Sequence, residues 1–113
     1  MTTVDTGRKA EQVAADFLQR KGCLVVQQNW RTRYCEIDVV AKRGNTVYFC
    51  EVKYRAQAAQ GSGLEYITAK KLARMRFAAE LWVQTHQWQG DYELCAVEVF
   101  GPNFQITAVA RDL

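Results

Sequence analysis

Asp38, Glu51 and Lys53 are the residues of this sequence whose types and spacing suit phosphate chemistry. Asp38 lies in the run Glu-Ile-Asp-Val-Val-Ala, and the other two lie in Thr-Val-Tyr-Phe-Cys-Glu-Val-Lys. Two facing carboxylates repel each other unless a proton, a neighbouring cation or a divalent ion compensates. Hard oxygen ligands suit Mg²⁺ or Mn²⁺, and a nearby lysine can orient the attacking water and offset charge on phosphate oxygens. The three side chains therefore predict a metal-dependent phosphodiester hydrolase.

The register of a hairpin decides whether these side chains meet. Gly44-Asn45 can take the positive φ values of a two-residue turn, and counting outward from it places Asp38 opposite Glu51 and Glu36 opposite Lys53, all on one side of the sheet. The other side is then taken by Ile37, Val39, Cys50 and Val52. A slip of one residue would separate the acids. The alternative is an exposed strand face that carries only an ion pair between Glu36 and Lys53.

The elements that must position these residues follow from periodicity and turn signals. Apolar residues at helical spacing predict helices over about 6–21 and 65–86, the first capped by Asp5 or Thr6. Short runs rich in β-branched and aromatic residues predict five strands, at 23–29, 36–41, 46–53, 92–100 and 104–110. The small and polar segment 56–63 predicts a mobile loop. Residues 1–113 are thus expected to form a single α/β domain with the element order αβββαββ.

Composition excludes several classes of protein. With 49% hydrophobic and 24% charged residues, the chain is typical of a globular domain. No apolar run exceeds four residues, and the first residues lack the features of a signal peptide, so we expect no membrane partner and a cytoplasmic location. None of the four cysteines forms a Cys-x-x-Cys pair, which predicts free thiols in that compartment.

Basic residues are unevenly distributed along the chain. Between Arg31 and Arg76 there are ten Lys or Arg against four acids, whereas from Phe77 onward one basic residue stands against five acids. This asymmetry could offer a positive face to phosphates, although a solvated surface is the commoner meaning of scattered charges. The residues that we expect to contact nucleic acid are Arg31, Arg33, Tyr54, Arg55, Lys70 and Arg74. Aromatic stacking on bases could add Trp30 and Tyr34, or these rings could pack on neighbouring strands.

The order of these segments resembles a known group of proteins. An Asp on one strand and Glu-x-Lys on the next, between two helices, is similar to the PD-(D/E)xK nuclease superfamily. A closer resemblance, to the YraN family of small endonuclease-like proteins, spans nearly the whole chain. It rests on Gly7, Glu11, Ala14, Leu18 and Gly22, followed by Asn29-Trp30-Arg31, Glu36-Ile37-Asp38, Glu51-Val52-Lys53-Tyr54-Arg55 and Tyr92-Glu93-Leu94. Cys35 departs from the family pattern, which usually has Gly before Glu-Ile-Asp.

The resemblance implies a fold, a site and a substrate class. The fold is a restriction-endonuclease-like core with a central mixed sheet flanked by helices. The site uses Asp38, Glu51 and Lys53 as the catalytic set, with Glu11 of the first helix as a further acid. Asp38, Glu51 and Glu11 would hold Mg²⁺ or Mn²⁺. The substrate would be nucleic acid, with DNA favoured and branched or damaged DNA as the narrower expectation.

Other functions stay open at this stage. The chain could be a nucleic-acid-binding module without turnover, or a scaffold that recruits a repair partner through its second helix. A homodimer is also left open. Metal-dependent cleavage would separate the first prediction from both alternatives.

Overall fold

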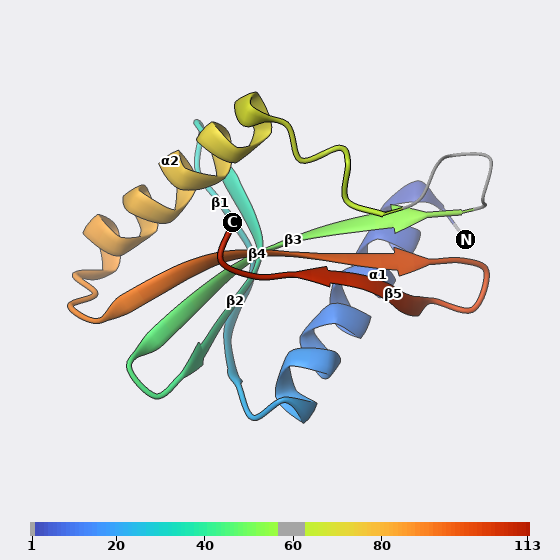
Figure 1. The fold of residues 1–113 in the computed structure, drawn as a ribbon, viewed down its shortest axis with the longest axis horizontal. Helices are drawn as coiled ribbons and strands as arrows, with labels where there is room; N and C mark the ends of the chain where they lie inside the picture. The colour runs from blue at the N-terminus through green and yellow to red at the C-terminus, as the bar shows by residue number, and fades with distance from the viewer. Residues whose placement is uncertain (1, 57–62) are drawn as a thin grey trace.

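A computed structural model describes residues 2–56 and 63–113, and its elements follow the predicted order αβββαββ (Figure 1). The elements are α1 (Thr3–Arg20), β1 (Leu24–Arg31), β2 (Glu36–Arg43), β3 (Thr46–Arg55), α2 (Ala69–His86), β4 (Asp91–Phe100) and β5 (Gln105–Ala110). Residues 57–62 of the expected mobile loop lie outside the described part of the chain. Neither of the helices described is long and apolar enough to cross a membrane.

The strands form one mixed sheet with a helix on each face. Its order is β1-β2-β3-β4-β5, and all neighbours are antiparallel except β3 and β4, which are parallel. Parallel neighbours need a crossover connection, which α2 provides. Figure 1 shows α1 and α2 on opposite sides of the sheet. This arrangement confirms the predicted α/β class, with a central mixed sheet flanked by helices as in a restriction-endonuclease-like core.

Two apolar clusters fix the helices. On one face, small residues of α1 such as Ala10 and Ala14 lie against Val39 of β2 and Val97 of β4, all almost completely buried. On the other face, Trp82 of α2 packs with residues of β2 to β4 such as Phe49, whose ring centroid is 5.3 Å from that of Trp82. Burial of large apolar side chains typically contributes about 1.5–3 kcal/mol each, so the clusters hold both helices firmly on the sheet.

The hairpin has the predicted register. The β2–β3 ladder pairs Arg43 with Thr46 at the turn and continues to Val39 and Cys50. Gly44 alone of the two turn residues takes a positive φ, +61°, as in hairpin turns with glycine at the first central position. The next residues beyond the last ladder pair are Asp38 and Glu51.

Two details of the predicted strand faces are wrong. Ile37 packs with the cluster around Phe49 instead of sharing a face with Val39. Asn29 of β1, between the residues that pair with Ile37 and Val39, takes a left-handed φ of 54°, and this irregularity breaks the alternation of faces. Glu36 does not face Lys53, because the β2–β3 ladder ends at Val39. Glu36 pairs instead with Arg31 of β1, its neighbour in register.

Each helix begins after a threonine N-cap that was not among the caps predicted from the sequence. Thr2 caps α1 and forms a reciprocal capping box with Asp5, so the helix begins at Thr3 and not at about residue 6. Thr68 caps α2: its Oγ1 accepts a hydrogen bond of 3.1 Å from the Lys71 N–H. That cap starts α2 at Ala69 and not at about residue 65.

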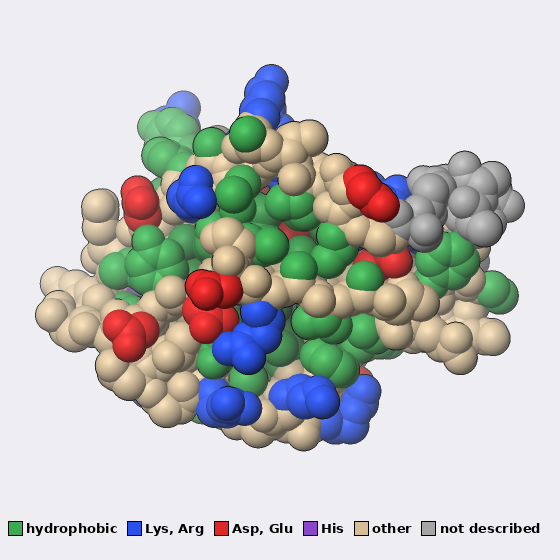
Figure 2. Space-filling model, viewed as in Figure 1, with side chains coloured by type: hydrophobic (Ala, Val, Ile, Leu, Met, Phe, Trp, Pro, Cys, Tyr) green, Lys and Arg blue, Asp and Glu red, His purple; other side chains and the backbone are tan. Residues whose placement is uncertain are grey.

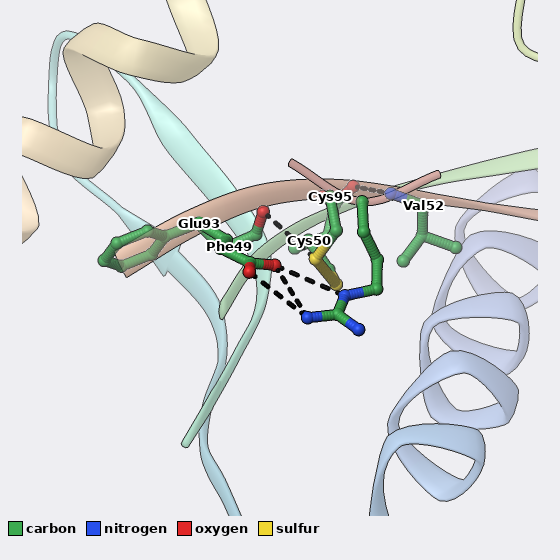
Figure 3. The surroundings of a disulfide bond; sticks show 7 residues. Phe49, Cys50, Val52, Glu93 and Cys95 are labelled. Carbon is green, nitrogen blue, oxygen red and sulfur yellow. Dashed lines mark hydrogen bonds and ion pairs between the residues drawn. A yellow bond between two sulfur atoms is a disulfide. The ribbon is translucent and has the colours of Figure 1, made fainter. Parts of the chain in front are cut away.

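Two of the four cysteines are paired, contrary to the expectation of free thiols. Cys50 and Cys95 are neighbours in register on β3 and β4, with Cα atoms 4.7 Å apart, and form a disulfide (Figure 3). Cys23 and Cys35 are free. A separation of 45 residues gave no sign of this pairing, because only the parallel register of β3 and β4 brings the two side chains together.

Replacement of the α2 cap tests how this helix is set. We expect Thr68→Ala to lower the free energy of unfolding by about 1 kcal/mol, since the Lys71 N–H loses its acceptor. Thr68→Ser keeps the acceptor and should cost less than half as much. The control is Thr85→Ala, at an exposed position near the other end of α2. Urea denaturation curves measure all three, and equal stability of the two Thr68 variants would show that the cap contributes nothing.

Candidate metal and phosphate site

Asp38 lies where β2 and β3 stop pairing. Its Oδ2 accepts a hydrogen bond of 2.8 Å from the backbone N–H of Val52, so the carboxylate is fixed between the two strands. Burial, and then the negative charge of Glu51, raise the pKa of Asp38 from 3.8 to about 7. The hydrogen bond from Val52 acts in the opposite direction, and the charges of Glu11 and Glu36 raise the pKa further. Asp38 and Glu51 are thus close enough to repel, as predicted.

Glu51 is held by a lysine from the other side of the site. The Nζ of Lys71, in the first turn of α2, lies 2.8 Å from the Oε1 of Glu51. Both side chains are partly exposed, at 33% and 21%. The ion pair joins α2 to β3 and places a positive charge beside the two acids.

Tyr66 lies near both acids and contacts two cations of β3. Tyr66, just before α2, has its ring 5.5 Å from the Nζ of Lys53 and 5.6 Å from the guanidinium carbon of Arg55. Burial and the charges of Glu51 and Asp38 raise the pKa of Tyr66, so its hydroxyl stays protonated. That hydroxyl is the one buried side-chain N or O atom without a hydrogen-bond partner among the described residues. A donor is therefore available close to the acids.

Glu11 contributes charge to the site from α1. Its Oε1 accepts a hydrogen bond of 2.8 Å from the side chain of Asn29, on β1. Because it also raises the pKa of Asp38, the carboxylate acts on the acids electrostatically. The structure thus places Glu11 on the Asp38 side of the site, with Asn29 as its hydrogen-bond partner.

Two of the residues expected to contact nucleic acid are engaged inside the fold. Arg55 pairs with the buried carboxylate of Glu98 at 3.3 Å, and its side chain is 13% exposed. Tyr54 stacks on Phe104, with ring centroids 5.1 Å apart. Both side chains fasten β3 to the end of the sheet that carries β4 and β5. They offer little surface to a phosphate or a base.

The other expected contacts lie at the surface. Arg31 pairs with Glu36 at 3.2 Å, and Arg33 lies over the ring of Tyr34 at 5.5 Å. Lys70 and Arg74 are exposed on α2, four residues apart, and line one groove, so they share a face of the helix. Lys70 and Arg74 thus lie in the same groove as Glu51, whereas Arg31 lines a separate hollow with Glu11 and Asn29.

Basic side chains on the face seen in Figure 2 lie in separate regions. Figure 2 shows Lys and Arg side chains along the lower edge, where α1 lies in Figure 1, and at the top, where α2 begins. Exposed hydrophobic side chains lie between these regions. The asymmetry along the sequence therefore becomes at least two basic regions, of which the one at α2 adjoins the acids.

The oxygen donors fit a hard divalent cation. Asp38 and Glu51 are neighbouring carboxylates, and the pKa of Asp38 is raised first by burial and then by the negative charge of Glu51, which a cation would compensate. In the part of the chain that is described, no group of three or more His, Cys, Asp and Glu could hold a metal ion. Mg²⁺ commonly uses one or two protein carboxylates and takes its other ligands from water and phosphate. Asp38 and Glu51 are thus the residues that could hold such an ion.

Lys71 and Tyr66 were not found from the sequence. Lys71 stands beside Lys70, and only the cap at Thr68 determines which of the two faces Glu51. Tyr66 was assigned to the second helix, whereas it lies in the segment before that helix. The sequence signal that could have located the start of α2 is Thr68, because threonine is a favoured N-cap residue.

Comparison with known proteins gives a family without an assigned activity. The model of "Uncharacterised protein family UPF0102" matches residues 10–109. The chain is 45% identical over 80 residues to a UPF0102 protein of Parafrankia sp. (strain EAN1pec), covering 71% of this chain and 68% of the relative. It is 33% identical over 106 residues to a UPF0102 protein of Cytophaga hutchinsonii, covering 94% of each. Neither name states a substrate.

The raised pKa of Asp38 predicts a pH dependence of stability in the absence of metal. The folded chain keeps this proton up to about pH 7 and the unfolded chain only to about 3.8, so the free energy of unfolding falls as pH rises between these values. We expect Asp38→Asn to remove this part of the dependence and to stabilise the protein at pH 8 by about 1–3 kcal/mol.

The measurement is urea denaturation in EDTA from pH 4 to 8. Glu80→Gln is the matched control, because Glu80 is an exposed acid of α2 whose charge is not among those that raise the pKa of Asp38. It should shift stability by less than about 0.5 kcal/mol. If the free energies of unfolding of wild type and Asp38→Asn differed by the same amount at every pH, the raised pKa of Asp38 would be contradicted.

Proposed function

The chain belongs to the uncharacterised protein family UPF0102. From that premise we propose that the protein is a nuclease that depends on Mg²⁺ or Mn²⁺. It would hydrolyse phosphodiester bonds of nucleic acid, with DNA as the expected substrate. Membership confirms the resemblance to the YraN-like group but assigns no activity. The observation that carries the proposal is the burial of Asp38 beside Glu51, whose own carboxylate is paired with Lys71. Folding gains nothing from two facing carboxylates, whereas cation binding does.

Each side chain has a role in this proposal. Asp38, fixed by the Val52 N–H, and Glu51 would hold the ion. A bound Mg²⁺ or Mn²⁺ supplies Lewis acidity at the phosphate and lowers the pKa of water. Lys53, on the same face of β3 as Glu51, orients the attacking water and offsets charge on the phosphate oxygens. The hydroxyl of Tyr66 is a further donor for a phosphate oxygen.

Glu11 and Lys71 adjust the charge of the site. Glu11 acts from α1 through its field or through a water molecule, since its own hydrogen bond goes to Asn29. Lys71 neutralises Glu51 in the metal-free protein. An ion held by Glu51 would take over this compensation and would leave the Lys71 ammonium free to bind a phosphate. This exchange keeps the number of compensating positive charges nearly constant.

The ion pair between Glu51 and Lys71 also favours a second candidate, a nucleic-acid-binding module without turnover. An ammonium group 2.8 Å from Glu51 already compensates one acid, as a structural ion pair would. In that case the cations of α2 bind phosphates and the acids only shape the surface. Binding without cleavage in Mg²⁺ or Mn²⁺ would select this candidate.

Removal of either acid tests the nuclease proposal. We expect Asp38→Asn and Glu51→Gln to lower Mn²⁺-dependent cleavage at least about 100-fold, since each deletes a ligand of the ion. DNA binding in EDTA should be unchanged or tighter, because a charge that repels phosphate is lost. The substrates are single-stranded, duplex, flap and four-way DNA and RNA, with Glu80→Gln, at an exposed acid of α2 that does not line the groove beside Glu51, as the control. Cleavage by both variants at the wild-type rate would place the site elsewhere.

Salt dependence tests which basic region meets nucleic acid. Each phosphate contact contributes about −0.9 to the slope of log K against log salt for duplex DNA. We expect the double variant Lys70→Gln/Arg74→Gln to flatten this slope by about two units. The matched control on α1, Arg8→Gln/Lys9→Gln, should leave it within about half a unit. Equal slopes for the two double variants would show that the basic region at α2 is only a solvated surface.

A further inference from the structure

A groove of about 580 Å³ runs from Glu51 along the first half of α2 to the start of β2. Its walls include Tyr34, Lys70, Arg74 and Phe77. The volume is within the range of about 300–1,000 Å³ that is typical of ligand sites. Because Glu51 lines one end, a strand bound in the groove would enter the site of the two acids directly.

The charge of the groove is positive on the α2 wall. Its two acids are both paired, Glu51 with Lys71 and Glu36 with Arg31. Among the ion pairs of the described residues, none involves Lys70 or Arg74. Two exposed cations one helical turn apart are therefore available for successive phosphates.

The groove also exposes two aromatic rings. Tyr34 is 71% exposed and Phe77 is 51% exposed, although large aromatic side chains usually bury most of their surface. By contrast, Trp30 packs in the cluster beneath α2, and Tyr54 is stacked on Phe104. The ring of Tyr34 is further accompanied by the guanidinium of Arg33 at 5.5 Å. Exposed rings beside cations are the usual components of a surface that binds single strands.

We propose that this groove binds an unpaired nucleic-acid strand, with bases stacked on Tyr34 and Phe77 and phosphates on Lys70 and Arg74. In a duplex the faces of the bases are covered by their neighbours, so only an unpaired strand can use the two rings. Resting on the proposed nuclease function, the preferred substrate is then a flap or splayed end, with cleavage beside the single-stranded segment. Strand binding itself does not depend on catalysis.

The test measures binding in EDTA, so that cleavage plays no part. The probes are a fluorescein-labelled single-stranded DNA, the matching duplex, and a single strand that carries 2-aminopurine, whose fluorescence falls on stacking. The variants are Tyr34→Ala, Tyr34→Phe, Phe77→Ala and Phe77→Leu, with Leu24→Ala as the control. Leu24 is an exposed apolar residue of β1 that does not line the groove.

We expect Tyr34→Ala, Phe77→Ala and Phe77→Leu each to weaken single-strand binding about 5- to 100-fold and to restore 2-aminopurine fluorescence. Duplex affinity should change less than about twofold, and Tyr34→Phe, which keeps the ring, should bind the single strand like the wild type. Phe77→Leu keeps an apolar side chain on α2, so a loss of affinity there does not reflect misfolding.

Two results would overturn the proposal: wild-type protein that binds the single strand no better than the duplex, or ring variants that lose affinity for both to the same extent. The outcome is independent of the nuclease assignment. Stacking by the wild type without cleavage in Mn²⁺ would reject the nuclease and keep the groove. Cleavage of duplex by the ring variants at the wild-type rate, with single-strand affinity unchanged, would keep the nuclease and reject the groove.

Discussion

The burial of Asp38 beside Glu51, at the point where β2 and β3 separate, is the constraint on which the rest of the site depends. The carboxylate accepts the Val52 N–H at 2.8 Å, so it cannot turn away to solvent without leaving that donor unpaired. Its raised pKa shows that the position costs free energy when the group is charged. Lys71 of α2 compensates the charge of the neighbouring Glu51, and the crossover between β3 and β4 is what brings that helix to the acids.

Much of this arrangement could be predicted because it depends on local rules. The glycine turn at Gly44 fixed the pairing of β2 with β3, and that register makes Asp38 and Glu51 the first residues beyond the last ladder pair. The order αβββαββ followed from periodicity. The same rules failed at Ile37, because the left-handed Asn29 on the neighbouring strand interrupts the alternation of faces. The sequence of β2 alone contains no sign of an irregularity that lies in β1.

The remaining features depend on contacts between elements far apart in sequence. The disulfide requires the parallel register of β3 and β4, and the burial of Arg55 requires Glu98 on β4. From its residue type alone, Arg55 was predicted to contact phosphate. In the structure it pairs with Glu98 and is part of the folded interior. The role of Lys71 depended on where α2 begins, and a single cap at Thr68 sets that point. Helix ends are the part of such predictions most sensitive to one hydrogen bond.

The central claim is that Asp38 and Glu51 share a divalent ion, and its most direct test is anomalous diffraction at the manganese absorption edge from crystals soaked in Mn²⁺ at pH 8. At that pH Asp38 is ionised in the metal-free protein, since its pKa is about 7. The account predicts one strong anomalous peak in coordination distance of both carboxylates, with Lys71 moved away from Glu51. Crystals in which no peak lies between these residues, while Lys71 remains on Glu51 at saturating Mn²⁺, would contradict it.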